Sequence, residues 1–208
     1  AHSIRNNQQR HCGGVAQMTM KLNKDALWRR EKFGFFIGRE IVGEKIGDVP
    51  RYEFLKGTWL GRHFLTKSLY EYTADKNDPL TFITPFELHI QPDKHFTHDM
   101  GSVPAFAQIL SPKDRFLASY LFHDSGYEHK GLWFRNVAGL SAAPSDWEFL
   151  PQKVFQGDAG QFSFVPLERD CLDRMLRHWA GAQGALAAER QVIYSAVRAG
   201  GGPDWKIA

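Results

Sequence analysis

The sequence predicts an α+β protein in which an N-terminal antiparallel sheet precedes about three helices. From Phe33 to about Ser102, β-branched and aromatic residues alternate with polar ones in short runs between turn residues, which is typical of antiparallel strands. Further along the chain, apolar residues recur at three- and four-residue steps, which is typical of helices. Strands followed by helices indicate the α+β class. We therefore expect a single domain over residues 20–208, mainly β over 20–102 and mainly α over 103–208.

The start of the chain differs in composition from the rest. Residues 1–19 are rich in Asn, Gln, Ser, Gly and His, and they carry Arg5 and Arg10 without any carboxylate. Such a segment offers too little apolar surface to order itself. We expect residues 1–19 to form a polar N-terminal tail that binds a neighbouring chain.

Charge, hydropathy and cysteine content exclude several classes of protein. The formal charge of +3 is small and the basic residues are dispersed, which argues against specific binding of nucleic acid. No apolar run reaches the ~18 residues of a membrane-spanning helix, and the polar opening lacks the apolar centre of a signal peptide. Cys12 and Cys171 are far apart, so we expect neither a disulfide framework nor a CxxC metal site.

The strand signals come in a short series. Three segments alternate in polarity or are rich in β-branched and aromatic residues, and the sequence DKNDP supplies a turn before the last of them. The segments are GTWLGRHFL at 57–65, SLYEYTA at 68–74 and PLTFITPFELHIQP at 79–92.

The first helix is predicted to begin after Ser111, because serine is a good N-cap and Pro112 suits the first helical position. One face of this helix then carries a histidine between aromatic side chains at three- and four-residue steps. Those residues are Phe116, Tyr120, His123 and Tyr127.

A segment rich in Gly, Ala, Pro and Ser follows from Gly131 to about Gly160, and we interpret it as a loop that serves as a lid, a partner-binding segment or packing. A second helix is predicted from near Pro166, with an apolar stripe formed by Leu172, Leu176 and Trp179. A third helix is predicted over 185–199 and ends at the sequence GGGP.

Two interpretations of the second helix follow from its charges. Asp173 shares a side of the helix with Arg169 and Arg177, four residues before and after it, and Asp170 lies nearby. In the first interpretation these residues form a solvated ladder of charges. In the second, Asp173 reaches the imidazole of His123, fixes its tautomer and stabilises its protonated form, as a general base that activates water requires.

The sequence FTHDMGSVP, residues 96–104, supplies a third element. Gly101 permits a tight turn that exposes backbone carbonyls beside the Asp99 carboxylate. Oxygen ligands of this kind suit a hard cation, and Asp124 offers a second carboxylate. The alternative is an Asx-turn that only leads the chain into the helices.

These motifs, in this order, resemble the phage-associated domain of unknown function 1353, over roughly residues 70–205. That family has a D-x-x-S-V-P turn, a helix that ends in H-D-x-x-Y, and a later helix with R-x-x-x-D. The matching residues are Asp99, Ser102, Val103 and Pro104, then His123, Asp124 and Tyr127, then Arg169 and Asp173.

The helix pair is also similar to that of prokaryotic secreted phospholipase A(2). That likeness implies a hydrolase in which His123 takes a proton from water and Asp173 orients His123. It also implies that Asp124 and the Asp99 loop hold calcium or another divalent cation. Three further residues would support the site around this pair, namely Tyr127, Arg169 and Ser102.

The resemblance to a phage family implies a tailed-phage or prophage protein, found in the virion or the host cytoplasm, whose N-terminal tail binds other phage structural proteins. The alternative is a purely structural component of a tail, baseplate or head-tail assembly, in which the same residues form a buried polar network. A third interpretation, a divalent metal site of the HD phosphohydrolase type, requires further helical ligands, and the other histidines fall mostly in strands or loops.

Overall fold

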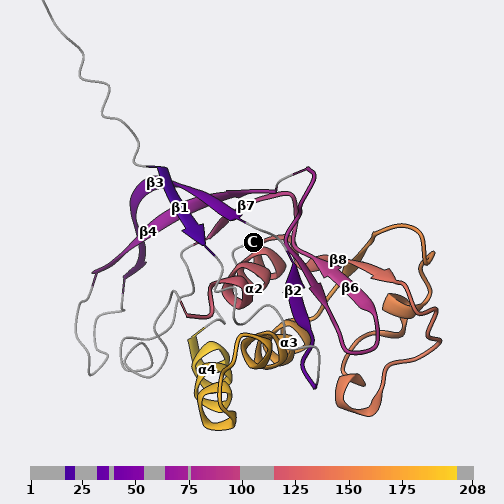
Figure 1. Cartoon of the computed structure of the whole chain (residues 1–208). Coiled ribbons are helices and arrows are strands. Elements are labelled where there is room, and N and C mark those ends of the chain that lie inside the picture. The colour runs from indigo at the N-terminus through magenta and orange to yellow at the C-terminus, as the bar shows by residue number, and fades with distance from the viewer. Residues whose placement is uncertain are drawn as a thin grey trace, which may run out of the picture.

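The computed structural model has the predicted α+β architecture, with two antiparallel sheets and three helices in the described part of the chain (Figure 1). The backbone is described for residues 17–21, 32–37, 40–53, 64–74, 76–98 and 115–200. Side chains are described for residues 32–37, 70–74, 76–98 and 115–200.

The first sheet has four strands in the order β1-β3-β4-β7. Their bounds are Gln17–Lys21 for β1, Glu40–Glu53 for β3, Phe64–Thr73 for β4 and His95–His98 for β7. The predicted tail boundary at residue 19 falls inside β1, where Thr19 pairs with Val42 of β3. Residues 1–16 lie outside the described part of the chain.

The second sheet has five strands in the order β2-β5-β6-β8-β9. Their bounds are Phe35–Ile37 for β2, Thr81–Ile83 for β5, Leu88–Gln91 for β6, Gly131–Asn136 for β8 and Ser163–Pro166 for β9. The hairpin between β5 and β6 is closed by Thr84, whose Oγ1 accepts a hydrogen bond from the backbone N–H of Leu88 at 2.9 Å.

The segment interpreted as a loop, residues 131–160, begins with a strand and contains two short 3₁₀-helices, which corrects that prediction for those residues. Its first residues form β8, where Leu132 and Phe134 are buried and the alternate residues Trp133 and Arg135 are partly exposed. Two 3₁₀-helices follow, at Ser145–Trp147 and Gln152–Phe155. The Gly- and Pro-rich composition concealed a strand of only six residues, in which the alternation spans three periods.

The three helices are α2 at Leu117–His129, α3 at Arg169–Ala182 and α4 at Ala187–Gly200. Helix α2 begins later than predicted, with Phe116 at its N-cap position, while Ser111 and Pro112 lie outside the described residues. No helix among the described residues is both long enough and apolar enough to cross a membrane.

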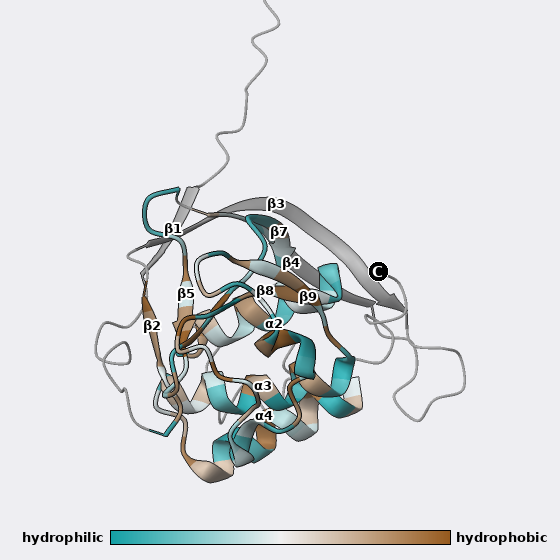
Figure 2. Ribbon diagram, turned by 90° about the vertical axis from the view of Figure 1, so that its right-hand side faces the viewer, coloured by the Kyte–Doolittle hydropathy of each residue, from teal (hydrophilic) through white to brown (hydrophobic). Residues whose placement is uncertain are grey.

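Helix α2 forms the centre of the molecule, with the four-stranded sheet on one side and helices α3 and α4 on the other (Figure 1). Its apolar residues are buried around most of its circumference, as expected of a helix packed on several sides. Figure 2 shows strongly hydrophobic segments in β2, β5 and α2. The predicted stripe of α3, Leu172, Leu176 and Trp179, is fully buried.

Helices α2 and α3 approach each other closely at a glycine. A Cβ atom added to Gly126 would lie 2.5 Å from a terminal methyl carbon of Leu172, well inside van der Waals contact. Gly126 lies on α2 between His123 and Tyr127, so this contact sets the spacing of the two helices where those side chains leave the helix.

We therefore expect Gly126→Val to lower the free energy of unfolding by about 1 to 3 kcal/mol, because it overpacks the contact between α2 and α3. Gly160→Val is the matched control, since Gly160 lies in an exposed loop where an added Cβ meets only the Asp158 carboxylate, at 3.6 Å. Urea denaturation of both variants measures the difference. Equal stability of the two variants would contradict the close approach.

Candidate functional site

The predicted contact between His123 and Asp173 is present. The Nε2 atom of His123, on α2, lies 3.0 Å from Oδ1 of Asp173, on α3. The Asp173 side chain has no exposed surface and that of His123 is 8% exposed. The two helices thus bury a histidine and a carboxylate together, which is favourable only when both are hydrogen-bonded.

Tyr127 holds the same carboxylate oxygen. Its hydroxyl donates to Oδ1 of Asp173 at 2.5 Å, and its ring lies 4.2 Å from the His123 ring, centroid to centroid. Residues 123 and 127 are one helical turn apart, so both side chains leave α2 on the same face. The H-D-x-x-Y spacing therefore brings both donors to one acceptor.

Arg169 links this pair to helix α4. Its Nε donates to the Tyr127 hydroxyl at 3.0 Å and lies 3.4 Å from Oδ2 of Asp173. Its Nη2 donates to the backbone carbonyls of Val197 and Arg198, at 2.9 and 2.8 Å. Those carbonyls belong to the last turn of α4, where backbone acceptors lack helical partners and a cation is stabilised.

Arg198 is a member of the site that the sequence did not predict. Its Nη1 donates to Oδ2 of Asp173 at 3.3 Å and also lies 3.3 Å from Asp170. Arg177, which was expected beside Asp173, lies instead over the ring of Tyr194 on α4. The position of Arg198 depends on how α4 packs, and no local spacing in the sequence encodes that.

Both interpretations of the α3 charges apply, to different residues. Asp170 pairs with Arg174 at 2.7 Å, and both side chains are about half exposed, as in a solvated ladder. Asp173, three residues later, faces the interior and accepts hydrogen bonds from α2 and α4.

The pKa of Asp173 is shifted by two opposing causes. Burial alone would raise the pKa of this carboxyl, but the hydrogen bonds from His123 and Tyr127 and the charge of Arg169 outweigh burial and lower it. Asp173 is therefore ionised at neutral pH, and as a carboxylate it can only accept hydrogen bonds.

The pKa of His123 is shifted in the opposite direction. Burial would lower this pKa, but hydrogen bonding to Asp124 and Asp173, together with their charges, raises it above its usual value. Because Asp173 only accepts, Nε2 of His123 carries the proton in that bond. The other ring nitrogen, Nδ1, lies 3.9 Å from Oδ1 of Asp124 and is the atom that can take up a further proton.

The cation ligands predicted from the sequence are placed only in part. Asp124 lies beside His123, whereas Asp99 and Ser102 lie outside the described residues. Among the residues that are described, no group of three or more His, Cys, Asp or Glu side chains could hold a metal ion. The described residues alone therefore do not supply three such ligands to a cation.

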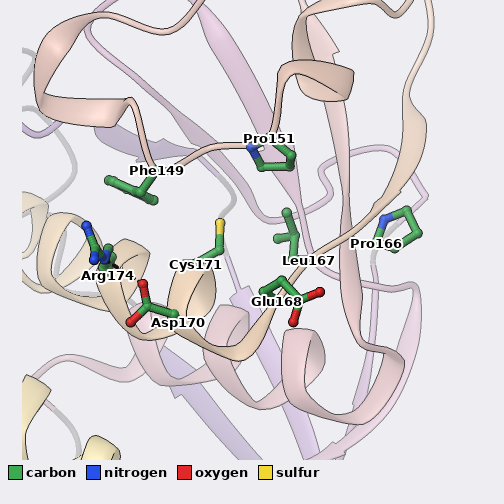
Figure 3. Close-up of a pocket in the computed structure, with 8 residues that line it drawn as sticks. All are labelled: Phe149, Pro151, Pro166, Leu167, Glu168, Asp170, Cys171 and Arg174. Carbon is green, nitrogen blue, oxygen red and sulfur yellow. Dashed lines mark ion pairs between the residues drawn. The ribbon is translucent and has the colours of Figure 1, made fainter.

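A cavity of about 550 Å³ lies at the start of α3, away from His123. Cys171 lines it, and Figure 3 shows the thiol pointing toward the segment that carries Phe149 and Pro151. Neither His123 nor Asp173 lines this cavity. Burial raises the pKa of the Cys171 thiol to about 12, so it is not a reactive nucleophile.

Comparison of the chain with protein-family models, with curated proteins and with solved structures gave no significant match.

The buried carboxylate gives a first prediction for this site. Asp173→Asn removes the charge that His123, Arg169 and Arg198 share, and should cost about 3 to 5 kcal/mol of stability, as breaking a buried ion pair does. The matched control is Asp170→Asn, on the exposed face of the same helix, which should cost less than about 1 kcal/mol. Chemical denaturation measures both, and similar costs would contradict a central role for Asp173.

The raised pKa of His123 gives a second prediction. A group whose pKa is higher in the folded state stabilises the protein fully below its unfolded pKa, about 6.5, and loses that contribution as pH rises through the folded pKa. The stability lost in His123→Asn should therefore be larger at about pH 6 than at about pH 9. Urea titrations at the two pH values measure it, and a loss independent of pH would contradict the shift.

Proposed function

We propose that the chain is a tailed-phage or prophage protein that hydrolyses an ester, with His123 as general base and Asp173 as the residue that orients it. The observation that supports this most is the hydrogen bond between Nε2 of His123 and a buried carboxylate. A base that activates water needs a fixed tautomer, a fixed ring orientation and a charge that stabilises the imidazolium. Asp173 is placed to supply all three.

In the proposed reaction, Nδ1 of His123 takes a proton from a water molecule as the water oxygen attacks the ester carbonyl carbon. The protonated ring then returns this proton to the departing alkoxide, so that the products are an acid and an alcohol and His123 is neutral again. Asp173 stays ionised throughout, because Tyr127, Arg169 and Arg198 hold it as a carboxylate.

The substrate and the cation belong to the same proposal. The similarity to secreted phospholipase A(2) favours a phospholipid ester, and it would assign calcium to Asp124 together with the Asp99 loop. A bound divalent cation would polarise the carbonyl oxygen that accumulates charge. Asp124 supports this assignment by its position next to His123.

Association with a virion is supported by the phage-family motifs, and binding of other phage structural proteins through the N-terminal tail, residues 1–19, is part of the proposal. A purely structural role is the second candidate, and the burial of the pair favours it. The His123 side chain is 8% exposed, and neither His123 nor Asp173 lines the cavity beside α3. In that case the network would serve only to join three helices.

The deciding experiment compares His123→Asn with the wild type in two assays on the same samples, ester hydrolysis with and without calcium and thermal unfolding. For a general base, we expect the substitution to reduce hydrolysis of phospholipid or another ester by at least about 100-fold. The fold should survive, because Asn keeps a polar group that can still donate to Asp173.

His95→Asn is the histidine control, since His95 on β7 is exposed and contacts Glu71 rather than His123 or Asp173. An inactive wild type, together with a His123→Asn variant destabilised by about 1 to 3 kcal/mol, would refute the hydrolase and favour the structural role.

A further inference from the structure

The contact between α3 and α4 extends beyond Asp173 to a cluster of positively charged side chains. Asp173 on α3 contacts Arg198 on α4. One turn further along α3, Arg177 lies over Tyr194, which is one turn earlier on α4, so the two helices run antiparallel. The next residue along this face of α4 is Arg190, whose guanidinium lies 4.2 Å from the ring centroid of Phe33.

These two arginines differ from the others on the same helices. Arg169, Arg174 and Arg198 each pair with Asp170 or Asp173. By contrast, neither Arg177 nor Arg190 has an ion pair with a carboxylate among the residues that the structure describes, and each is stacked on an aromatic ring. Stacking engages the face of a guanidinium and leaves its N–H groups, which lie in its plane, directed outward.

Two buried polar atoms without hydrogen-bond partners mark the same place. The Nε atom of Arg190 is buried without a hydrogen-bond partner, and so is Nδ1 of His178, the neighbour of Arg177 on α3. The His178 ring is enclosed by aromatic rings, with the centroid of Trp147 at 4.1 Å and that of Phe33 at 6.1 Å. Because a guanidinium Nε always carries a proton, Arg190 has a buried donor without an acceptor, which is unfavourable.

The electrostatics of the cluster are unbalanced. Burial lowers the pKa of Arg190, and the like charge of Arg177 lowers it further. Burial lowers the pKa of His178 to about 4, aided by Arg177, Arg190 and Lys32, and only Asp146 acts in the opposite direction. Like charges that outnumber their counter-charges favour an anion between them.

We propose that Arg177 and Arg190 bind the phosphate group of an anionic ligand. Two guanidinium forks match the oxygens of a phosphate by charge-assisted hydrogen bonds, and two positive charges suit an anion that carries between one and two negative charges. The proposal does not depend on hydrolysis, because none of these side chains contacts His123 or Asp173.

The test uses inorganic phosphate as the probe and sodium chloride at equal ionic strength as the reference, with binding measured by calorimetry. Phosphate should bind the wild type, whereas Arg177→Gln and Arg190→Gln should each bind it about tenfold more weakly or worse. Arg174→Gln is the matched control, because it removes one charge from α3 outside the cluster and should bind like the wild type.

A second readout keeps the test valid if Arg190→Gln unfolds. The ring proton of His178 can be titrated by NMR in the folded wild type, and bound phosphate should raise its pKa from about 4, since an adjacent negative charge favours the imidazolium. No phosphate-specific change in either readout, or equal weakening in the Arg174→Gln control, would overturn the site.

The source of the phosphate group is distinguished by vesicles. Vesicles that contain phosphatidylglycerol should bind the wild type more than Arg190→Gln if the ligand is a lipid headgroup, with phosphatidylcholine vesicles as the neutral reference. Binding of inorganic phosphate without binding of vesicles would assign the site to a soluble phosphate compound. Binding of neither would overturn the proposal.

Discussion

The arrangement of the helices depends on one buried carboxylate. Asp173 accepts hydrogen bonds from α2 through His123 and Tyr127, and from α4 through Arg198. Removing an ion from water costs several kcal/mol, and only close, well-directed donors compensate that cost. Each helix must therefore keep its position for the carboxylate to remain satisfied, and Arg169 adds a second link by capping the last turn of α4.

The direction of these hydrogen bonds determines which ring nitrogen of His123 carries a proton. A carboxylate cannot donate, so the hydrogen bond to Asp173 fixes the proton on Nε2 of His123 and leaves Nδ1 on the side of Asp124. Arg169 and Arg198 act on the other oxygen of Asp173 and compete with His123 for its charge. The pKa of His123 is nevertheless raised, because two carboxylates outweigh the burial of the ring.

The parts of this arrangement that could be predicted from the sequence are those with a local period. The four-residue step from His123 to Tyr127 places both on one face of α2, and the buried stripe of α3 fixes which side of that helix meets α2. Arg198 was missed because its contact depends on the packing of α4. Arg177 was assigned to Asp173 because Arg169 and Arg177 are each four residues from Asp173, and this spacing alone does not show which of the two contacts it. Strand β8 was missed because its residues alternate too briefly within a Gly- and Pro-rich segment.

The most direct test of the central claim is the tautomer of His123, read from ¹⁵N NMR of its ring above its pKa. An Asp173 carboxylate that accepts from Nε2 predicts a neutral ring protonated at Nε2, with Nδ1 unprotonated, and a pKa above about 6.5. In Asp173→Asn, a variant chosen to remove the charge, that pKa should fall. A ring protonated at Nδ1, or a pKa unaffected by the loss of the Asp173 charge, would contradict the account.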